Sequence, residues 1–138
     1  MLVPSRKMEF IVKTNIKASA KVIYTAWLNS EGHTKMTGGM AAVSDKVGAE
    51  FTAWDGYIEG KNVALEPYKR IVQSWRTSQF EEKEEDSQIE ILLKEVDGET
   101  ELVLIHTNLP ESGAHYKKGW DDHYFNPMRT YFSDLLKN

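Results

Sequence analysis

Four histidines are the side chains with the widest chemical range in this 138-residue chain, because an imidazole can exchange a proton near neutral pH or bind a metal ion. They are His33, His106, His115 and His123. No two of them have the H-x-x-x-H or H-E-x-x-H spacing that would place two metal ligands on one face of a helix. His115 and His123 would lie about two helical turns apart, too far to share one ion without further ligands. The sequence therefore predicts no metal site.

His106 is the most informative of the four, because it falls in a segment that alternates between two faces. The alternation over Thr100–Thr107 places it on the same face as Leu102 and Leu104. A neutral, buried histidine with one hydrogen-bond partner is the simpler interpretation. The alternative is a proton donor in a pocket, or the general acid of a cyclase-like enzyme, which would need a carboxylate within hydrogen-bond distance.

The sequence lacks the other arrangements that carry catalysis. There are no cysteines, which excludes disulfides, thiolate nucleophiles and cysteine-ligated zinc or iron–sulfur centres. The serines lack the G-x-S-x-G elbow, and Gly38-Gly39 is not followed by the Lys-Ser/Thr of a phosphate-binding loop. Asp121 and Asp122 are adjacent on a predicted helix and point about 100° apart, so they cannot act as one carboxylate pair. We expect neither an enzyme nor a bound cofactor.

Composition limits the classes of partner. Seventeen Lys and Arg residues against 21 Asp and Glu residues give a net charge of −4, which disfavours nucleic-acid and anionic-membrane binding. No run approaches the roughly 20 apolar residues of a spanning helix, and the N-terminus lacks the apolar stretch of a signal peptide. We expect a cytoplasmic protein with one domain over residues 8–138, preceded by a flexible lead-in over residues 1–7.

The elements that must position these residues begin with one strand and two helices. Glu9–Ile16 alternates with the period of a half-buried strand. Ser19 is a good N-cap for a helix that runs through Trp27, and a second helix from Ser30 would end before Gly38-Gly39.

Short strands joined by turn signals follow, and they indicate an antiparallel meander. The run Glu81–Asp86 is strongly acidic, and we interpret it as a solvated hairpin loop, with an acidic docking site as the alternative. The predicted strands are 40–43, 50–54, 57–65, 70–76, 88–96 and 100–107, with Asp55-Gly56 and Asp97-Gly98 as turns and Gly60 as a bulge or sharp bend.

After Pro110 the apolar period changes from two to about 3.6, which predicts a long amphipathic helix. Pro127 lies inside it and should remove a backbone hydrogen bond and kink the axis. The predicted order β-α-α-β-β-β-β-β-β-α gives an α+β protein in which a curved antiparallel sheet wraps around the C-terminal helix. The stripe of this helix consists of Trp120, Tyr124, Met128, Tyr131 and Leu135, widened by Phe125 and Phe132.

Several spaced motifs resemble one known family, the activators of the heat-shock protein 90 ATPase, and in particular their C-terminal-type domain. This family belongs to the START/birch-pollen-allergen (SRPBCC) superfamily with the helix-grip fold. The resemblance covers nearly the whole chain from Met8. The family motif F-x-x-[FW]-D-G-x-I-x-G is matched by Phe51, Trp54, Asp55, Gly56, Ile58 and Gly60. The motif L-x-P is matched by Leu65–Pro67, and I-V-x-x-W-R by Ile71–Arg76. The match extends to Gly98–Leu104 and, in the C-terminal helix, to Gly119-Trp120 with Tyr124-Phe125, Met128 and Tyr131-Phe132.

The resemblance implies a fold and suggests a partner. Eukaryotic activators of this kind carry a separate N-terminal domain that supplies much of their chaperone contact, and 138 residues leave no room for it. The implied protein is a stand-alone homologue. Because function resides in sites rather than in folds, co-chaperone activity does not follow from the family alone.

In relatives with this fold, a gap between sheet and helix holds apolar molecules such as lipids, sterols or polyketide-like compounds. The aromatic bulk of the C-terminal helix favours a filled core or a narrow slot over a sterol-sized hole. The Asp55-Gly56 turn would be a rim of the pocket mouth or, as we favour, only a tight turn. Trp75 fits equally a cavity wall or the core under the helix, and Arg76 fits a surface ion pair better than an anion site.

The leading hypothesis is a non-catalytic domain that binds a small hydrophobic molecule between sheet and C-terminal helix, with His106 or Tyr124 orienting its polar end. A structure with no void between sheet and C-terminal helix, and with Trp75 and Trp120 in direct contact, would refute it. The alternatives are a co-chaperone-like interaction module for heat-shock protein 90 in the stress response and, third, a cyclase- or hydrolase-like enzyme. The candidate lining residues are Phe10, Val12, Trp27, Phe51, Ile58, Trp75, Ile91, Leu104, His106, Trp120, Tyr124 and Met128.

Overall fold

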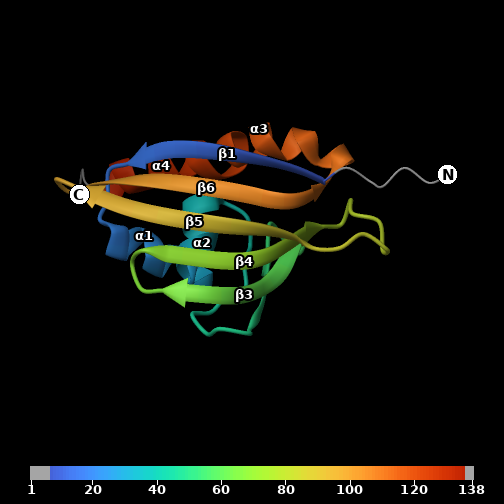
Figure 1. Cartoon of the computed structure of the whole chain (residues 1–138). Helices are drawn as coiled ribbons and strands as arrows, with labels where there is room; N and C mark the ends of the chain where they lie inside the picture. The colour runs from blue at the N-terminus through green and yellow to red at the C-terminus, as the bar shows by residue number, and fades with distance from the viewer. Residues whose placement is uncertain (1–6, 136–138) are drawn as a thin grey trace.

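A first strand is followed by two helices, then by consecutive strands and finally by a C-terminal helical segment, an order close to the predicted one (Figure 1). The structure is a computed structural model that describes residues 7–135. The predicted lead-in lies outside the described residues except for Lys7, which is the first residue of β1. The elements are β1 (Lys7–Ile16), α1 (Ala20–Trp27), α2 (Ser30–Thr37), β2 (Glu50–Ala53), β3 (Ile58–Glu66), β4 (Arg70–Thr77), β5 (Ser87–Val96), β6 (Glu99–Pro110), the 3₁₀ helix η1 (Glu111–His115), α3 (Tyr116–Trp120), the π-helical turn η2 (Asp121–Phe125) and α4 (Asn126–Leu135).

The sheet is antiparallel, with the strand order β1-β6-β5-β4-β3-β2. The first strand therefore pairs with the last, so that Val12 lies opposite Leu104. Figure 1 shows the helices together on one side of the curved sheet, and alternate strand residues such as Phe10, Ile71 and Ile91 are buried. The predicted α+β helix-grip architecture is confirmed.

One predicted strand, Met40–Val43, is wrong. Only Ala42 forms a bridge, to Thr52 of β2. The backbone N–H and C=O of Val43 instead hydrogen bond to Ser30 Oγ, at 2.9 and 3.1 Å. Because side chains satisfy these backbone groups, the segment has no need of a second neighbouring strand.

The two N-terminal helices begin and end where the sequence predicts. Ser19 Oγ accepts a hydrogen bond from the Val22 N–H at the start of α1. Asn29 caps α2 in the same way through the Gly32 N–H, and Gly38 ends it in the left-handed conformation with φ of 90°.

The C-terminal helical segment contains a π turn immediately before α4, whose second residue is Pro127. Proline has no N–H to donate to the carbonyl four residues earlier, and a π turn is one way to accommodate the lost bond. The predicted irregularity therefore lies one turn before the proline. Phe132 is buried as predicted, whereas Leu135, predicted in the apolar stripe, is 48% exposed.

Gly60 is required for close approach of β3 and β4 rather than for a bulge. The register shift between these strands lies between Asn62 and Ala64, so of the two predicted alternatives at Gly60, a bulge or a sharp bend, the bulge is wrong. A Cβ on Gly60 would lie 1.9 Å from the Ser74 carbonyl oxygen and 2.8 Å from Phe51 Cε1.

We expect Gly60→Ala to lower the free energy of unfolding by about 3 kcal/mol or more, because backbone cannot move aside as a flexible side chain can. Urea denaturation followed by circular dichroism measures the change. Gly119→Ala is the control, since its Cβ would meet nothing within 4 Å, and alanine in a helix should raise stability by up to about 1 kcal/mol. Equal stability of the two variants would contradict the account of Gly60.

Candidate functional site

An aromatic cleft opens at the end of the molecule where the β2–β3 turn and the end of β4 meet the C-terminal helical segment. Its volume is about 480 Å³, within the range of small-molecule sites in proteins. Most of its lining is aromatic, and we call it the aromatic cleft. The lining residues are Trp54, Tyr57, Trp75, His115, Tyr116, Lys118, Gly119, Trp120, Asp122, His123 and Tyr124.

The π turn contributes one wall of the aromatic cleft. It contains Asp122, His123 and Tyr124, three of the lining residues, and directly follows Trp120. π turns occur frequently at functional sites, because the extra residue changes the direction of side chains on one face. The charges in the wall are balanced, since Lys118 Nζ lies 2.6 Å from a carboxylate oxygen of Asp122.

Stacked aromatic rings close the inner end of the cleft. Tyr124 stacks on Trp27 at 5.0 Å between ring centroids and contacts Trp120 at 4.9 Å. Trp75 meets Trp120 at 5.5 Å. Direct contact between Trp75 and Trp120 was the predicted sign that no internal pocket exists. At this point aromatic rings do fill the space between sheet and helix.

The twelve residues predicted to line a pocket lie together in the core. Eleven are buried, and Val12 is half-buried against the same cluster. Only Trp75, Trp120 and Tyr124 also line the aromatic cleft. That any of them binds a ligand stays a prediction. The other nine are Phe10, Val12, Trp27, Phe51, Ile58, Ile91, Leu104, His106 and Met128.

His106 is buried and hydrogen bonded through both ring nitrogens. Trp120 Nε1–H donates to Nδ1 at 3.0 Å, so the ring proton is on Nε2 and donates to Ser87 Oγ at 2.9 Å. Ser87 in turn donates to the Trp75 carbonyl at 2.7 Å. Burial lowers the pKa of His106 to about 3, which keeps the ring neutral. The buried neutral histidine is confirmed, with two partners instead of one.

The enzyme hypothesis required a carboxylate beside His106 and an open cavity. Both partners of its ring are neutral groups, and the residue has 0% exposure. The Ser87–His106 contact does not make a nucleophile either, because the nitrogen that faces the serine carries the proton.

His33 is a buried polar residue that sequence reasoning missed. Its Nδ1–H donates to the Trp27 carbonyl at 2.9 Å, and Nε2 accepts from the Tyr124 hydroxyl at 2.9 Å. Burial lowers the pKa of His33 to about 4 and raises the pKa of Tyr124 above its usual range. Trp27 is only six residues from His33, but Tyr124 is 91 residues away, so sequence spacing gave no signal for that contact.

A second buried chain of hydrogen bonds runs from Trp27 to the loop after α2. Trp27 Nε1–H donates to Gln73 Oε1 at 3.2 Å, and Gln73 Nε2 donates to Asn62 Oδ1 at 2.9 Å. Asn62 then donates to the carbonyls of Ser44 and Lys46. Gln73 alternates along β4 with the same period as the buried Ile71 and Trp75, so its inward position follows from the strand itself.

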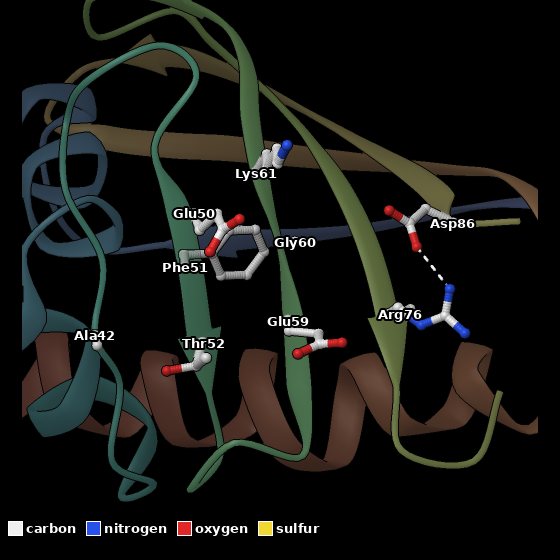
Figure 2. A pocket seen from close by; sticks show the side chains of 9 residues that line it. All are labelled: Ala42, Glu50, Phe51, Thr52, Glu59, Gly60, Lys61, Arg76 and Asp86. Atoms are coloured by element: carbon white, nitrogen blue, oxygen red, sulfur yellow. Dashed lines mark hydrogen bonds and ion pairs between the residues drawn. The ribbon is translucent and has the colours of Figure 1, made fainter. Parts of the chain in front are cut away.

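A second hollow, of about 300 Å³, lies over β2, β3 and β4 (Figure 2). Of the predicted site residues only Phe51 lines it. Arg76 lies at its edge, paired with Asp86 at 2.9 Å, and also donates to the carbonyls of Glu81 and Glu84. The predicted surface ion pair is therefore confirmed, and Arg76 orders the acidic loop between β4 and β5.

The curved antiparallel sheet packed against the C-terminal helical segment defines a helix-grip protein of the SRPBCC superfamily. The sequence pattern of the family described as "Activator of Hsp90 ATPase homolog 1-like protein" matches residues 17–133. The chain belongs to this family.

Individual relatives agree with this assignment. An activator of 90 kDa heat shock protein ATPase homolog from Dictyostelium discoideum is 26% identical over 125 residues, which cover 88% of this chain and 32% of the relative. The chain thus spans about a third of that protein.

Solved structures share the fold. An HSP90 activator from Plasmodium falciparum has a TM-score of 0.81 at 22% identity, covering 89% of this chain and 94% of that one. The Aha1 dimer from Colwellia psychrerythraea has a TM-score of 0.76 at 20% identity, covering 91% and 96%. Among the described helices, none is long and apolar enough to cross a membrane.

The two buried histidines should make stability fall with acidity. Their folded-state pKa values of about 4 and about 3 lie below the 6.5 of an unfolded histidine. Between these limits the unfolded chain binds the protons and the folded chain does not, so stability is full above pH ~6.5 and is lost as the pH falls. Near pH 5.5 we expect the free energy of unfolding to drop by about 2 to 3 kcal/mol per pH unit from the two residues.

Urea denaturation at pH 7.0, 6.0, 5.5 and 5.0 measures this slope. His106→Gln should reduce it by about half, because Gln does not titrate. His115→Gln, which changes an exposed side chain, is the control and should keep the full slope. A slope that His106→Gln leaves unchanged would contradict the prediction.

Proposed function

We propose that this chain is a non-catalytic binding domain that holds one small, predominantly apolar molecule in the aromatic cleft. The observation that carries this proposal is the cleft itself, about 480 Å³ in volume and lined by six Trp and Tyr side chains with few polar groups. Such a lining is typical of small-molecule sites. The ligand would lie at the mouth between sheet and helix, because stacked rings occupy the space further in.

The charges around the cleft favour an uncharged ligand. The one Lys and the one Asp in the lining, Lys118 and Asp122, pair with each other, so neither leaves a net charge for a ligand to neutralise. Flat aromatic molecules would gain most, because they can stack on the indole and phenol rings.

The expected affinity is modest. A bicyclic molecule that buries roughly 250 Å² of apolar surface gains about 6 kcal/mol at ~25 cal/mol per Å², before the entropic cost of binding. Dissociation constants from about 100 μM to about 1 mM are therefore expected.

A two-dimensional amide NMR titration against fatty acids, sterols, flavonoids and small bicyclic aromatics tests the proposal. We expect shifts to cluster at Trp75, Gly119, Trp120 and Tyr124. Gly119→Phe should fold, because nothing lies within 4 Å of its Cβ position, and the new ring should block the cleft and weaken binding at least tenfold.

Lys117→Phe is the matched control, because it adds the same ring at an exposed position of α3 outside the lining. Its binding should equal that of the wild type. A silent panel, or binding that Gly119→Phe leaves unchanged, would refute the proposal.

A second candidate function is stimulation of the heat-shock protein 90 ATPase in the cytoplasm. It is supported by the family and by the names of the Dictyostelium and Plasmodium relatives. The Dictyostelium relative is about three times longer than the matched region, so its activity as a whole protein comes to this chain only as a proposal.

We expect the purified chain to raise the ATP turnover of the host's heat-shock protein 90 by about twofold or more at saturation. A specific inhibitor of the chaperone subtracts background hydrolysis. Reversing the two exposed charges Glu82→Lys and Glu85→Lys tests whether the acidic loop takes part. No change in rate, together with no co-purification, would remove this candidate.

A further inference from the structure

Trp54 has an unusual backbone for its residue type. It has a φ of 50°, and the next two residues, Asp55 and Gly56, have φ of 60° and 88°. Three consecutive residues therefore adopt the left-handed conformation, which costs roughly 1–2 kcal/mol for each residue other than glycine. Such conformations persist only where contacts hold them, and they concentrate at ligand-binding sites.

The contacts that hold this turn come from the segment after α2. Asp55 N–H donates to the Met40 carbonyl at 2.9 Å, and Met40 N–H donates to Asp55 Oδ1 at 3.2 Å. The Trp54 indole lies across Gly39, where a Cβ would be only 2.4 Å from Trp54 Cε3. On its other side the indole meets the His123 ring edge-on, at 5.6 Å between centroids.

Held between Gly39 and His123, the indole N–H of Trp54 has no hydrogen-bond acceptor. It is the buried side-chain donor without a hydrogen-bond partner among residues 7–135. The indoles of Trp27 and Trp120, by contrast, donate to Gln73 and His106. A buried donor without an acceptor costs about 1–3 kcal/mol. Backbone strain and an unsatisfied donor thus coincide in a residue that lines the aromatic cleft.

We propose that Trp54 determines which molecules the aromatic cleft binds, by donating its indole N–H to a carbonyl oxygen on a flat aromatic ligand. This inference rests on the proposed small-molecule function. Because the nitrogen is buried, the indole must turn toward the cleft when the ligand enters and give up its contacts with Gly39 and His123. The strained backbone and the unsatisfied donor of the resting position lower the cost of this turn, and the new hydrogen bond offsets the lost contacts. The ligand class is an uncharged aromatic ketone or lactone rather than a hydrocarbon or an aliphatic chain.

The test uses two probes that differ only in the acceptor, 1-indanone and indane. Their dissociation constants are measured by amide NMR titration of the wild type and of Trp54→Phe, which keeps an aromatic wall and removes the donor. One neutral hydrogen bond predicts about three- to tenfold tighter binding of 1-indanone to the wild type. Trp54→Phe should reduce this preference to less than about twofold. Tyr68→Phe, which changes an exposed ring outside the cleft, is the control and should keep the preference.

A second measurement does not depend on the folding of Trp54→Phe. In the wild type, the indole N–H resonance of Trp54, assigned by through-bond correlation to the Trp54 backbone, should move downfield with 1-indanone and stay in place with indane. Binding of both probes with equal affinity, a preference that survives in Trp54→Phe, or an unmoved indole resonance would overturn the inference and leave the proposed function standing. Absence of binding by both probes and by the whole ligand panel would overturn the proposed function as well.

Discussion

The C-terminal helix is held on the sheet by aromatic side chains that each bring one polar atom to a buried partner. Three such residues recur every four positions along the helical segment. Each forms a hydrogen bond with a side chain of a different strand or helix. Because a buried polar group without a partner costs about 1–3 kcal/mol, a rotation or a slip of the helix would lose all three bonds together. The pairs are Tyr116–Thr77 at 2.5 Å, Trp120–His106 at 3.0 Å and Tyr124–His33 at 2.9 Å.

This constraint explains why the deepest part of the molecule is filled and the cleft lies at the mouth. Rings that must reach polar partners across the interior cannot leave a wide gap there, and Trp27, Trp120 and Tyr124 stack as a result. Of these three, Trp120 and Tyr124 also line the cleft. One cluster thus supplies the rigid core on its inner side and an apolar surface for a ligand on its outer side.

The sequence predicted the architecture because periodicity and capping act locally. The alternation of apolar and polar residues predicted the strands. Ser19 predicted the start of one helix and Gly38 the end of the next, and Pro127 predicted an irregularity in the C-terminal helix. It failed at Met40–Val43, where side chains from α2 and from the β2–β3 turn replace a neighbouring strand.

The candidate site was harder to predict, because its walls come from separate segments of the chain and depend on unusual backbone. The Asp55-Gly56 signal predicted a turn but gave no reason to expect Trp54 in the left-handed region as well. His33 was missed because the Tyr124 hydroxyl, 91 residues away, is brought to it only by tertiary packing. Interactions between distant residues of this kind leave no spacing pattern to read.

The pairing of β1 with β6 has a consequence for how the chain folds as it is synthesised. β1 is an edge strand that pairs only with β6, so that Val12 lies opposite Leu104, which is synthesised much later. Until β6 has left the ribosome, β1 has no strand to pair with. The residues before β6 therefore cannot complete the sheet or its core. Such a fold has a high contact order, for which closure of a long loop limits the rate and folding takes milliseconds to seconds. During translation the unpaired N-terminal strand therefore leaves apolar residues and a strand edge exposed, which favours aggregation until β6 is available.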